Sequence, residues 1–226
     1  MPFVFEERQS DSPCVARIWQ THSAHAGTFT STAVSTWELV LTTVHGTTTI
    51  TARGPETRAS AAAFPADAAF VGITFTLGTF MPRLPLRTLR DRQDATLPAA
   101  SRTAFWLQGA TWELPTFENA DVFVHRLIRQ GLLVRDPLVA AALAGETSAL
   151  SCRALQYRFV QATGVPQKTI QQIERAHRAV ALLEQGTPIA ATAVDLGYYD
   201  QAHLSNALTR FIGTTPAHIA QHRPGA

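Results

Sequence analysis

The stretch from Thr187 to Pro216, TPIAATAVDLGYYDQAHLSNALTRFIGTTP, constrains the chain most, because it holds two helix signals on either side of a turn signal. Thr187 before Pro188 is the pattern of an N-cap followed by proline at the first helical position. Gly197 can adopt the positive φ of a tight turn, and Asp200 can cap the next helix. The apolar stripe of that second helix follows at four- and three-residue steps: Leu204, Leu208 and Phe211. The pattern predicts a helix-turn-helix.

The second of these helices is expected to turn a polar face away from its buried stripe. The residues of that face are Gln201, Ala202, Ser205 and Asn206. Amide and hydroxyl groups on a short helix can hydrogen-bond to base edges in a DNA major groove. The face therefore indicates a helix that reads DNA.

Charge is weak evidence for such a role. The chain has 226 residues, enough for one large domain or two small ones, and its net charge is only +2. Residues 151–226 hold seven of the 19 Lys and Arg and four of the 17 Asp and Glu, a net charge of +3, which leaves −1 for residues 1–150. The basic half carries the helix-turn-helix. Because +3 is small, we expect few phosphate contacts per copy, and support from dimerisation or neighbouring helices.

The sequence predicts a cytoplasmic protein without a membrane partner. No apolar run reaches membrane-spanning length, and the polar start at Glu6, Glu7 and Arg8 lacks the apolar core of a signal peptide. Cys14 and Cys152 lie far apart without CxxC spacing, so free thiols are expected rather than a disulfide or a zinc site. Cys152 starts a predicted helix and is either structural or redox-sensitive.

The amino-terminal part is typical of an antiparallel β domain. Four runs rich in Val, Ile, Thr and aromatic residues are separated by turn residues: 15–20, 37–44, 47–53 and 68–77. His45-Gly46 marks a hairpin turn. In the second run, Trp37, Leu39 and Leu41 are expected on one side and Glu38, Val40 and Thr42 on the other. These strands predict a small antiparallel β-barrel or sandwich of cupin-like form, with room for a small-molecule pocket.

Residues 78–116 show no sustained period, so we expect a long connection with at most one short helix. Four arginines cluster here, either as a solvated basic face or as an anion-binding patch: Arg83, Arg87, Arg90 and Arg92. Three aromatic residues are expected to pack the segment onto the β domain rather than form an aromatic cage: Phe105, Trp106 and Trp112.

Helical periods begin at residue 117. Residues 117–136 predict a connector helix that stops near Gly131 and packs either on the protein's own core or in a dimer interface. Its apolar face comprises Ala120, Phe123, Val124, Leu127 and Ile128. Asp136 before Pro137 predicts a further helix that ends at Gly145.

Two more helices lead to the opening stretch. Ser151 is expected to cap a helix that ends at Gly164, with Leu155 and Phe159 inward. Arg153, Gln156 and Tyr157 are expected to face outward. A long helix over 167–185 follows, with a predicted buried stripe of Ile170, Ile173, Ala176, Val180 and Leu183.

Taken together, SxRxLQxxF, the long helix ending in HRAVALLE and the stretch GYYDQAHLSNALTRFIGTTP resemble the DNA-binding domain of AraC-type transcriptional regulators over roughly residues 137–221. The resemblance implies an α+β protein whose carboxy-terminal all-α domain holds two helix-turn-helix units joined by one long helix. It implies base-reading residues at Arg153, Gln156 and Tyr157 in the first unit, and at Gln201, Ala202, Ser205 and Asn206 in the second. Arg210, Thr214 and Thr215 are implied to contact the DNA backbone.

The amino-terminal half resembles the sensor-like domain that accompanies this DNA-binding domain in a group of bacterial regulators, in WELVLT, RGPETRA and GITFTLGTFMPRLP. The implied plan is a sensor-like domain over 1–116, a connector over 117–136 and a DNA-binding domain over 137–226. The implied protein is a sequence-specific transcriptional regulator that binds double-stranded DNA. A small-molecule effector, a homodimer and, for an activator, RNA polymerase are the further partners expected.

Two other functions compete with this one. His22, His25, His45 and Glu38 could form the metal set of a cupin-like enzyme, but HxxH on an extended segment does not converge as it would on a helix. No GxSxG, P-loop, GxGxxG or HExxH motif is present, so we expect no catalytic residue, metal or cofactor. The low net charge also fits a protein-interaction module without DNA binding.

Overall fold

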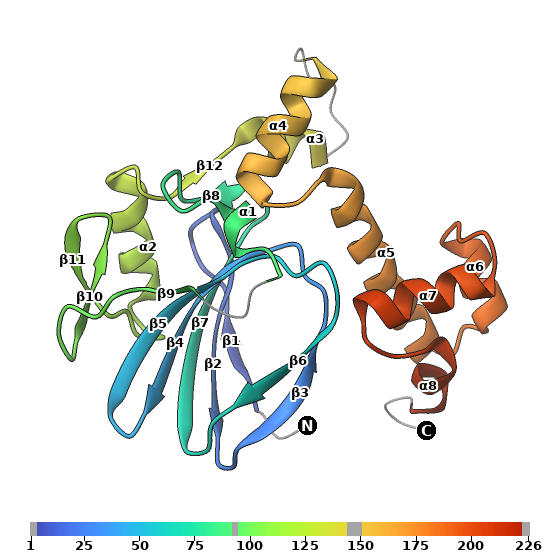
Figure 1. Ribbon diagram of the computed structural model, residues 1–226, viewed down its shortest axis with the longest axis horizontal. Helices are drawn as coiled ribbons and strands as arrows, with labels where there is room; N and C mark the ends of the chain where they lie inside the picture. Colours follow the sequence, from blue (N-terminus) through green and yellow to red (C-terminus); the bar gives the residue numbers. More distant parts are fainter. Residues whose placement is uncertain (1–3, 92–94, 144–150, 223–226) are drawn as a thin grey trace. The chain divides into compact units, whose positions relative to one another are not determined.

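The computed structural model describes residues 4–91, 95–143 and 151–222, and it divides into two compact units. Unit 1 comprises Met1–Thr28, Thr36–Pro55 and Ala63–Pro166, and unit 2 comprises Phe29–Ser35, Glu56–Ala62 and Gln167–Ala226. Strands dominate the first half of the chain and helices the second (Figure 1). The predicted α+β class, with an amino-terminal antiparallel sheet and a carboxy-terminal helical region, is confirmed.

Unit 1 is built on a six-stranded antiparallel sheet in the order β1-β2-β7-β4-β5-β9. The strands are β1 (Glu6–Arg8), β2 (Val15–Ser23), β7 (Ala68–Phe75), β4 (Glu38–Val44), β5 (Thr47–Arg53) and β9 (Ala95–Thr96). All four predicted strands are present. Among the described strands, β1 and β9 lie at opposite edges and do not pair, so closure into the predicted barrel is not seen. His45 and Gly46 form the β4–β5 turn with φ values of 48° and 73°, as expected for a tight hairpin.

The core of unit 1 lies on one face of this sheet. Leu39 and Leu41 are buried on it, together with Trp37, whose ring stacks on Phe75 at a centroid distance of 4.2 Å. The indole N–H of Trp37 donates to the carbonyl of Thr79 at 2.6 Å, so this buried ring has its polar group satisfied. Trp37, Leu39 and Leu41, which were expected to share one side of the strand, all belong to this core.

Helix α2 (Ala120–Arg129) packs against this core rather than standing free. Its buried residues are Ala120, Phe123, Val124 and Leu127, and Ile128 is partly buried. The predicted packing on the protein's own core is confirmed.

Between residues 78 and 116 the prediction was partly wrong. The short helix is present as α1 (Leu86–Leu89), but the segment also forms a hairpin of β10 (Ala104–Leu107) and β11 (Ala110–Glu113). Phe105 and Trp112 are buried against Phe123 with ring centroids 6.2 and 5.8 Å away, whereas Trp106 stays exposed. These aromatic residues pack the hairpin onto α2. This packing stabilises a hairpin whose turn sequence has only a weak preference for that structure.

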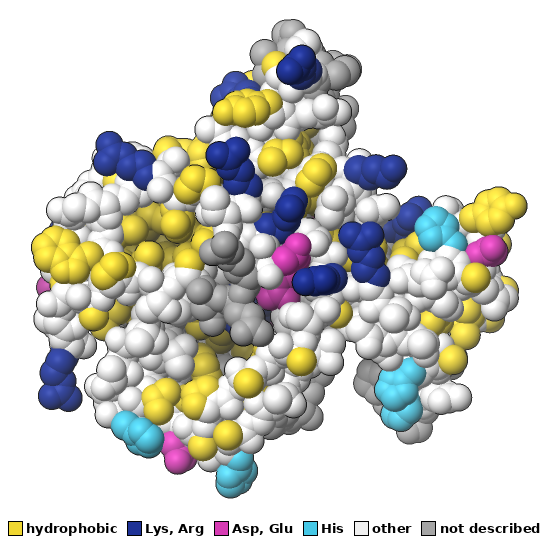
Figure 2. Space-filling view, viewed as in Figure 1, with side chains coloured by type: hydrophobic (Ala, Val, Ile, Leu, Met, Phe, Trp, Pro, Cys, Tyr) yellow, Lys and Arg dark blue, Asp and Glu magenta, His cyan; other side chains and the backbone are white. Residues whose placement is uncertain are grey.

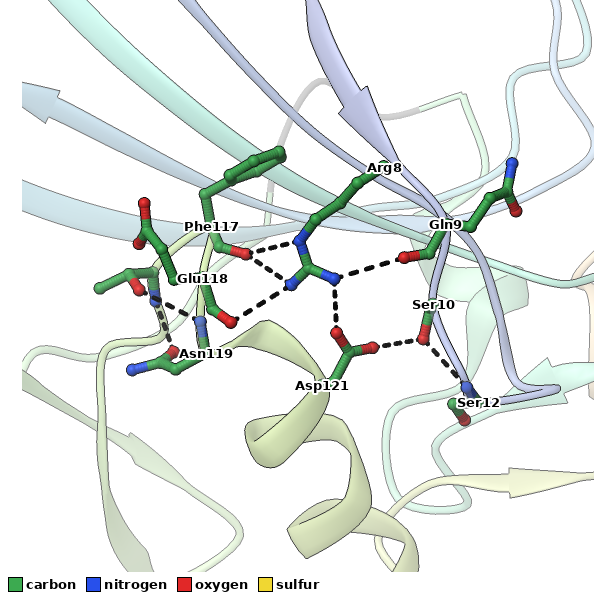
Figure 3. Close-up of polar contacts among 9 residues, drawn as sticks. Arg8, Gln9, Ser10, Ser12, Phe117, Glu118, Asn119 and Asp121 are labelled. Atoms are coloured by element: carbon green, nitrogen blue, oxygen red, sulfur yellow. Dashed lines mark hydrogen bonds and ion pairs between the residues drawn. The ribbon is translucent and has the colours of Figure 1, made fainter.

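Strand β1 is fastened to the start of α2 by Arg8 (Figure 3). Its guanidinium donates twice to the carbonyl of Phe117, at 3.1 and 2.6 Å, lies 5.2 Å from that residue's ring centroid and pairs with the carboxylate of Asp121. Ser10 donates to the other oxygen of Asp121. Burial raises the pKa of Asp121, but the hydrogen bonds from Ser10 and Arg8 outweigh it and leave the pKa below its ordinary value of 3.8.

The first two helices of the carboxy-terminal region belong to unit 1. Strand β8 (Thr79–Phe80) pairs with β12 (Val134–Arg135), and α3 (Pro137–Leu143) and α4 (Cys152–Thr163) follow. Asp136 caps α3 by accepting the N–H of Leu138 at 2.9 Å and also pairs with Arg158 of α4 at 3.1 Å. The predicted helix end at Gly145 lies outside the described residues. Cys14 is a free buried thiol, as predicted, and nothing is described of the Cys152 side chain.

Unit 2 contains α5 (Gln167–Glu184), α6 (Ile189–Asp195), α7 (Gln201–Phe211) and α8 (Pro216–Gln221). The predicted stripe of α5 is confirmed, except that Ala179 is fully buried and Val180 only partly so. Strands β3 (Gly27–Ser31) and β6 (Ser60–Phe64) pair with each other, and most of their residues belong to this unit. None of the helices described is long and apolar enough to cross a membrane.

Candidate nucleic-acid interface

Helices α6 and α7 form the predicted helix-turn-helix, with one correction at its start. The N-cap is Pro188 rather than Thr187, because the carbonyl of Pro188 accepts the first helical N–H, that of Thr192, at 2.9 Å. The Thr192 hydroxyl donates to the same carbonyl at 3.1 Å. Gly197 has the positive φ of 67° that its position requires, and Asp200 accepts the N–H of His203 at 2.7 Å. The predicted turn and second cap are confirmed.

The polar side of α7 is open to solvent. Leu204, Leu208 and Phe211 are buried, as predicted. On the other side Gln201, Ala202 and Asn206 are exposed and Ser205 is half-buried. The helix therefore offers a short row of amide and hydroxyl groups that are free to meet a base edge, and their role as base readers stays a prediction.

The three residues predicted at the DNA backbone lie at or after the end of α7. Arg210 is exposed, and its guanidinium lies 4.9 Å from the ring centroid of Phe211. Thr214 is half-buried, and the exposed Thr215 caps α8 by accepting the N–H of His218 at 3.3 Å. Because the Thr215 oxygen acts as an acceptor there, its O–H is still able to donate to a phosphate.

Tyr198 fixes the turn of this unit, a role that the sequence reasoning missed. Its ring is buried in the unit 2 core, under the guanidinium of Arg175 at 4.2 Å, and the ring of His203 meets it edge-on at 5.2 Å. Arg175 also donates to the carbonyl of Gly197 at 3.4 Å. Burial raises the pKa of Tyr198, partly offset by Arg175, so the phenol is neutral at physiological pH. The Gly-Tyr-Tyr run after the turn was the available signal.

Helix α4, in the first of the two predicted helix-turn-helix units, carries the other residues predicted to contact bases. Ser151 caps α4 by accepting the N–H of Ala154 at 3.3 Å, as predicted. Arg153, Gln156 and Tyr157 are exposed, the last with 70% of its surface accessible. Phe159 is buried and Leu155 only half-buried. These three side chains share a solvent-facing side of α4, and their base-reading role likewise stays a prediction.

A pocket of about 180 Å³ lies beside α4 within unit 1. It is lined by Phe80, Met81, Pro82, Pro85, Arg87, Tyr157, Val160 and Gln161. Tyr157 therefore belongs both to the predicted reading face and to this pocket. Of the arginine cluster, Arg87 lines the pocket, Arg90 lies 3.8 Å from the Asp91 carboxylate, and Arg92 lies outside the described residues.

The side chains weighed as a metal set do not meet. Glu38 and His45 stand at opposite ends of β4, and Glu38 accepts hydrogen bonds from Trp19 and Thr74 at 3.2 and 3.1 Å. Arg53 lies 3.6 Å from its other oxygen. Among the described residues, no three His, Cys, Asp or Glu side chains are grouped so as to hold a metal ion.

On the face that Figure 2 shows, Lys and Arg side chains stand at several separate places. This agrees with the net charge of +3 in residues 151–226. If this surface binds DNA, its low net charge predicts few phosphate contacts.

Residues 145–222 match a family model described as a helix-turn-helix domain. No curated protein is significantly similar to the chain in sequence. Two solved structures of ToxT from Vibrio cholerae resemble it at 9% identity. One covers 98% of this chain and 99% of ToxT, with a TM-score of 0.36. The other, wild-type ToxT of strain SCE256 bound to an unsaturated fatty acid, covers 99% and 96%, with a TM-score of 0.39.

TM-scores this low do not establish a shared fold, so the helix-turn-helix is identified from the matched domain and the geometry of α6 and α7. The matched residues 145–222 include α6 and α7, the helix-turn-helix that the structure shows. The chain therefore carries a helix-turn-helix domain over residues 145–222.

Proposed function

We propose that this protein is a sequence-specific transcriptional regulator that reads a two-part DNA site with α4 and α7. The observation that carries the proposal is α7 itself, capped by Asp200, buried along Leu204 and Leu208, and exposed along its amide-bearing side. In this proposal residues 137–226 form the DNA-binding domain. Residues 117–136 connect it to the sensor-like domain of residues 1–116.

Each exposed side chain has a base that suits it. Arg153 pairs with guanine, Gln156, Gln201 and Asn206 pair with adenine, and Ala202 and Ser205 sit against a thymine methyl. Tyr157 adds a hydroxyl donor and an aromatic face to the first unit. Arg210, Thr214 and Thr215 hold the phosphate backbone. On one face of the duplex, the two half-sites would be about 34 Å apart, one helical turn.

The test is selection of bound sites from a random DNA pool with the whole chain, followed by single variants on the selected site. Asn206→Ala and Arg153→Ala should each relax preference at one base pair and lose about 1–3 kcal/mol of binding free energy there. Gln171→Ala, an exposed amide on α5, is the matched control and should change nothing. Unchanged selectivity in both reading-helix variants would contradict the assignment.

The pocket beside Tyr157 is the proposed effector site. Its floor is apolar and Arg87 supplies one cation, so it suits a small organic anion. A panel of short carboxylic acids, followed by NMR, should shift pocket resonances in the wild type but not in Val160→Trp, where the indole fills the space. No binding by any acid would remove this part of the proposal.

The function proposed is binding rather than catalysis, carried out by a cytoplasmic homodimer. A second copy doubles the few cations available for phosphates, because residues 151–226 of one copy carry a net charge of only +3. Sedimentation on the selected DNA should show two chains of 24.5 kDa per site. If the protein activates transcription, RNA polymerase is its further partner.

A further inference from the structure

Two short segments from the first third of the chain belong to unit 2 with the second reading helix. They are residues 29–35 and 56–62, here called the clasp. Val34 and Glu56 join them through two backbone hydrogen bonds of 3.0 and 2.9 Å. The second segment lies largely within the RGPETRA motif, which the helix-turn-helix does not explain.

The clasp supplies hydrogen-bond donors to the end of α7. The last carbonyls of any helix have no partner within it. The N–H groups of Ile212 and Gly213 both donate to Leu208, which leaves the carbonyls of Arg210 and Phe211 for other donors. Ala59 donates to the carbonyl of Arg210 at 2.8 Å, and Ala33 donates to that of Phe211 at 2.7 Å. The clasp thus caps the reading helix from outside its own sequence neighbourhood.

Packing reinforces these hydrogen bonds. Ala33 is fully buried in the unit 2 core, and its carbonyl is 2.7 Å from Nε2 of His177 on α5. The turn after α7 also lies close to the clasp. A Cβ atom added at Gly213 would lie 2.7 Å from the Thr30 methyl and 3.1 Å from Cβ of Ala59. The clasp therefore contacts α5, the end of α7 and the following turn, which fixes α7 along its axis.

Arg58 brings a cation to the same place. It is exposed and directly precedes Ala59, whose N–H holds the carbonyl of Arg210. Arg210 is the predicted phosphate contact of α7. Two arginines, far apart in sequence, thus sit at the end of one reading helix, beside the turn where the DNA backbone is expected.

We propose that the clasp is part of the second DNA-reading unit, in which Ala33 and Ala59 position α7 and Arg58 contacts a DNA phosphate. This inference rests on the proposed function. It assigns the RGPETRA motif a role in DNA binding, although the motif lies in the sensor-like half of the sequence.

The phosphate contact is tested with Arg58→Ala on the selected DNA site. Loss of one phosphate contact should make the slope of log affinity against log salt shallower by about one, and weaken binding similarly at every sequence. Arg102→Ala, an exposed arginine of unit 1, is the control and should keep the wild-type slope. An unchanged slope in Arg58→Ala would overturn the phosphate contact.

The positioning role is tested at Gly213. Gly213→Ala and Gly197→Ala both place a Cβ on a glycine with positive φ, at 82° and 67°, but only the first meets the clasp. Gly213→Ala should weaken binding to the second half-site by about tenfold more than Gly197→Ala. Thr30→Ser removes the colliding methyl and should restore part of that loss in the double variant. No rescue would mean that Gly213 acts without the clasp.

Hydrogen exchange of the whole protein completes the test. The amides of Ala33 and Ala59 should be protected in the free protein and remain so on DNA, because the clasp stays on α7. Faster exchange on DNA would mean that the clasp is released, and would overturn the proposal. A wild type that binds no DNA refutes the proposed function itself. Binding with an unchanged Arg58→Ala slope and unprotected clasp amides refutes this inference alone.

Discussion

Asp200 determines where α7 begins. Its backbone is extended, with φ of −156°, and its carboxylate accepts the N–H of His203. A carboxylate at this end also complements the helix dipole. The first turn of α7, which carries Gln201 and Ala202, is therefore held by one side chain.

Asp200→Ala should lower the free energy of unfolding by about 1 kcal/mol, the usual loss for an N-cap. Urea unfolding followed by circular dichroism measures it. Asp195→Ala is the matched control, since Asp195 is the exposed last residue of α6, where a negative charge opposes the dipole. That variant should be neutral or slightly stabilised, and equal losses in both would argue against the cap.

At the scale of elements, we expect the attachment of α2 to β1 to depend on pH. The pKa of Asp121 lies below 3.8 in the folded protein, because Ser10 and Arg8 hydrogen-bond to its ionised form. A depressed folded pKa contributes stability that is present above the unfolded pKa and is lost as pH falls through the folded pKa.

Asp121→Asn should therefore be less stable than wild type near neutral pH, and the difference should shrink as the pH falls below about 4. Urea unfolding across pH 2–7 checks the trend, and it should locate the midpoint of the pH dependence to within ~1 pH unit. Asp67→Asn, at an exposed turn position with φ of 49°, serves as control and should run parallel to wild type. A constant difference for Asp121→Asn would contradict the role of its charge.

Elements with a regular apolar period could be predicted from sequence, and those fixed by distant partners could not. β4 and β5 alternate clearly around His45-Gly46. The β10–β11 hairpin was missed because its turn is Gln108-Gly109, a pair without a strong hairpin preference, although both residues have positive φ, 50° and 84°. The start of α6 was placed one residue early because Thr187 and Pro188 both suit a helix start.

The same distinction applies to the candidate interface. The exposed side of α7 follows from its own periodicity, so Gln201 and Asn206 could be named at once. The clasp joins Ala33 and Ala59 to carbonyls more than 150 residues away, through backbone groups that every residue carries. No residue type marks such a contact, so the sequence offers no signal for it.

At the scale of the whole molecule, the two helices proposed to read DNA belong to different compact units. Helix α4 belongs to unit 1 with the sheet and contacts α1 and β8. Helix α7 belongs to unit 2 with the clasp. Each reading helix therefore depends for its support on residues outside the matched helix-turn-helix domain.

A fragment of residues 137–226 should consequently melt at a lower temperature than unit 2 in the whole chain and bind the selected DNA more weakly. It lacks Ala33 from its core and the two N–H groups at the end of α7. Calorimetry and fluorescence anisotropy measure the two effects. Circular dichroism should still show helix, which separates weakened support from failure to fold. Equal melting and affinity would show that the matched domain needs no help.

The clasp also bears on how a regulator of this build can be recombined. A chimera that joined residues 137–226 to a foreign sensor would inherit every base-reading side chain but leave the carbonyls of Arg210 and Phe211 open. Such a graft would need 29–35 and 56–62 transplanted with it. Transferring this DNA-binding domain to another protein would therefore require three separate segments of the chain rather than one contiguous stretch.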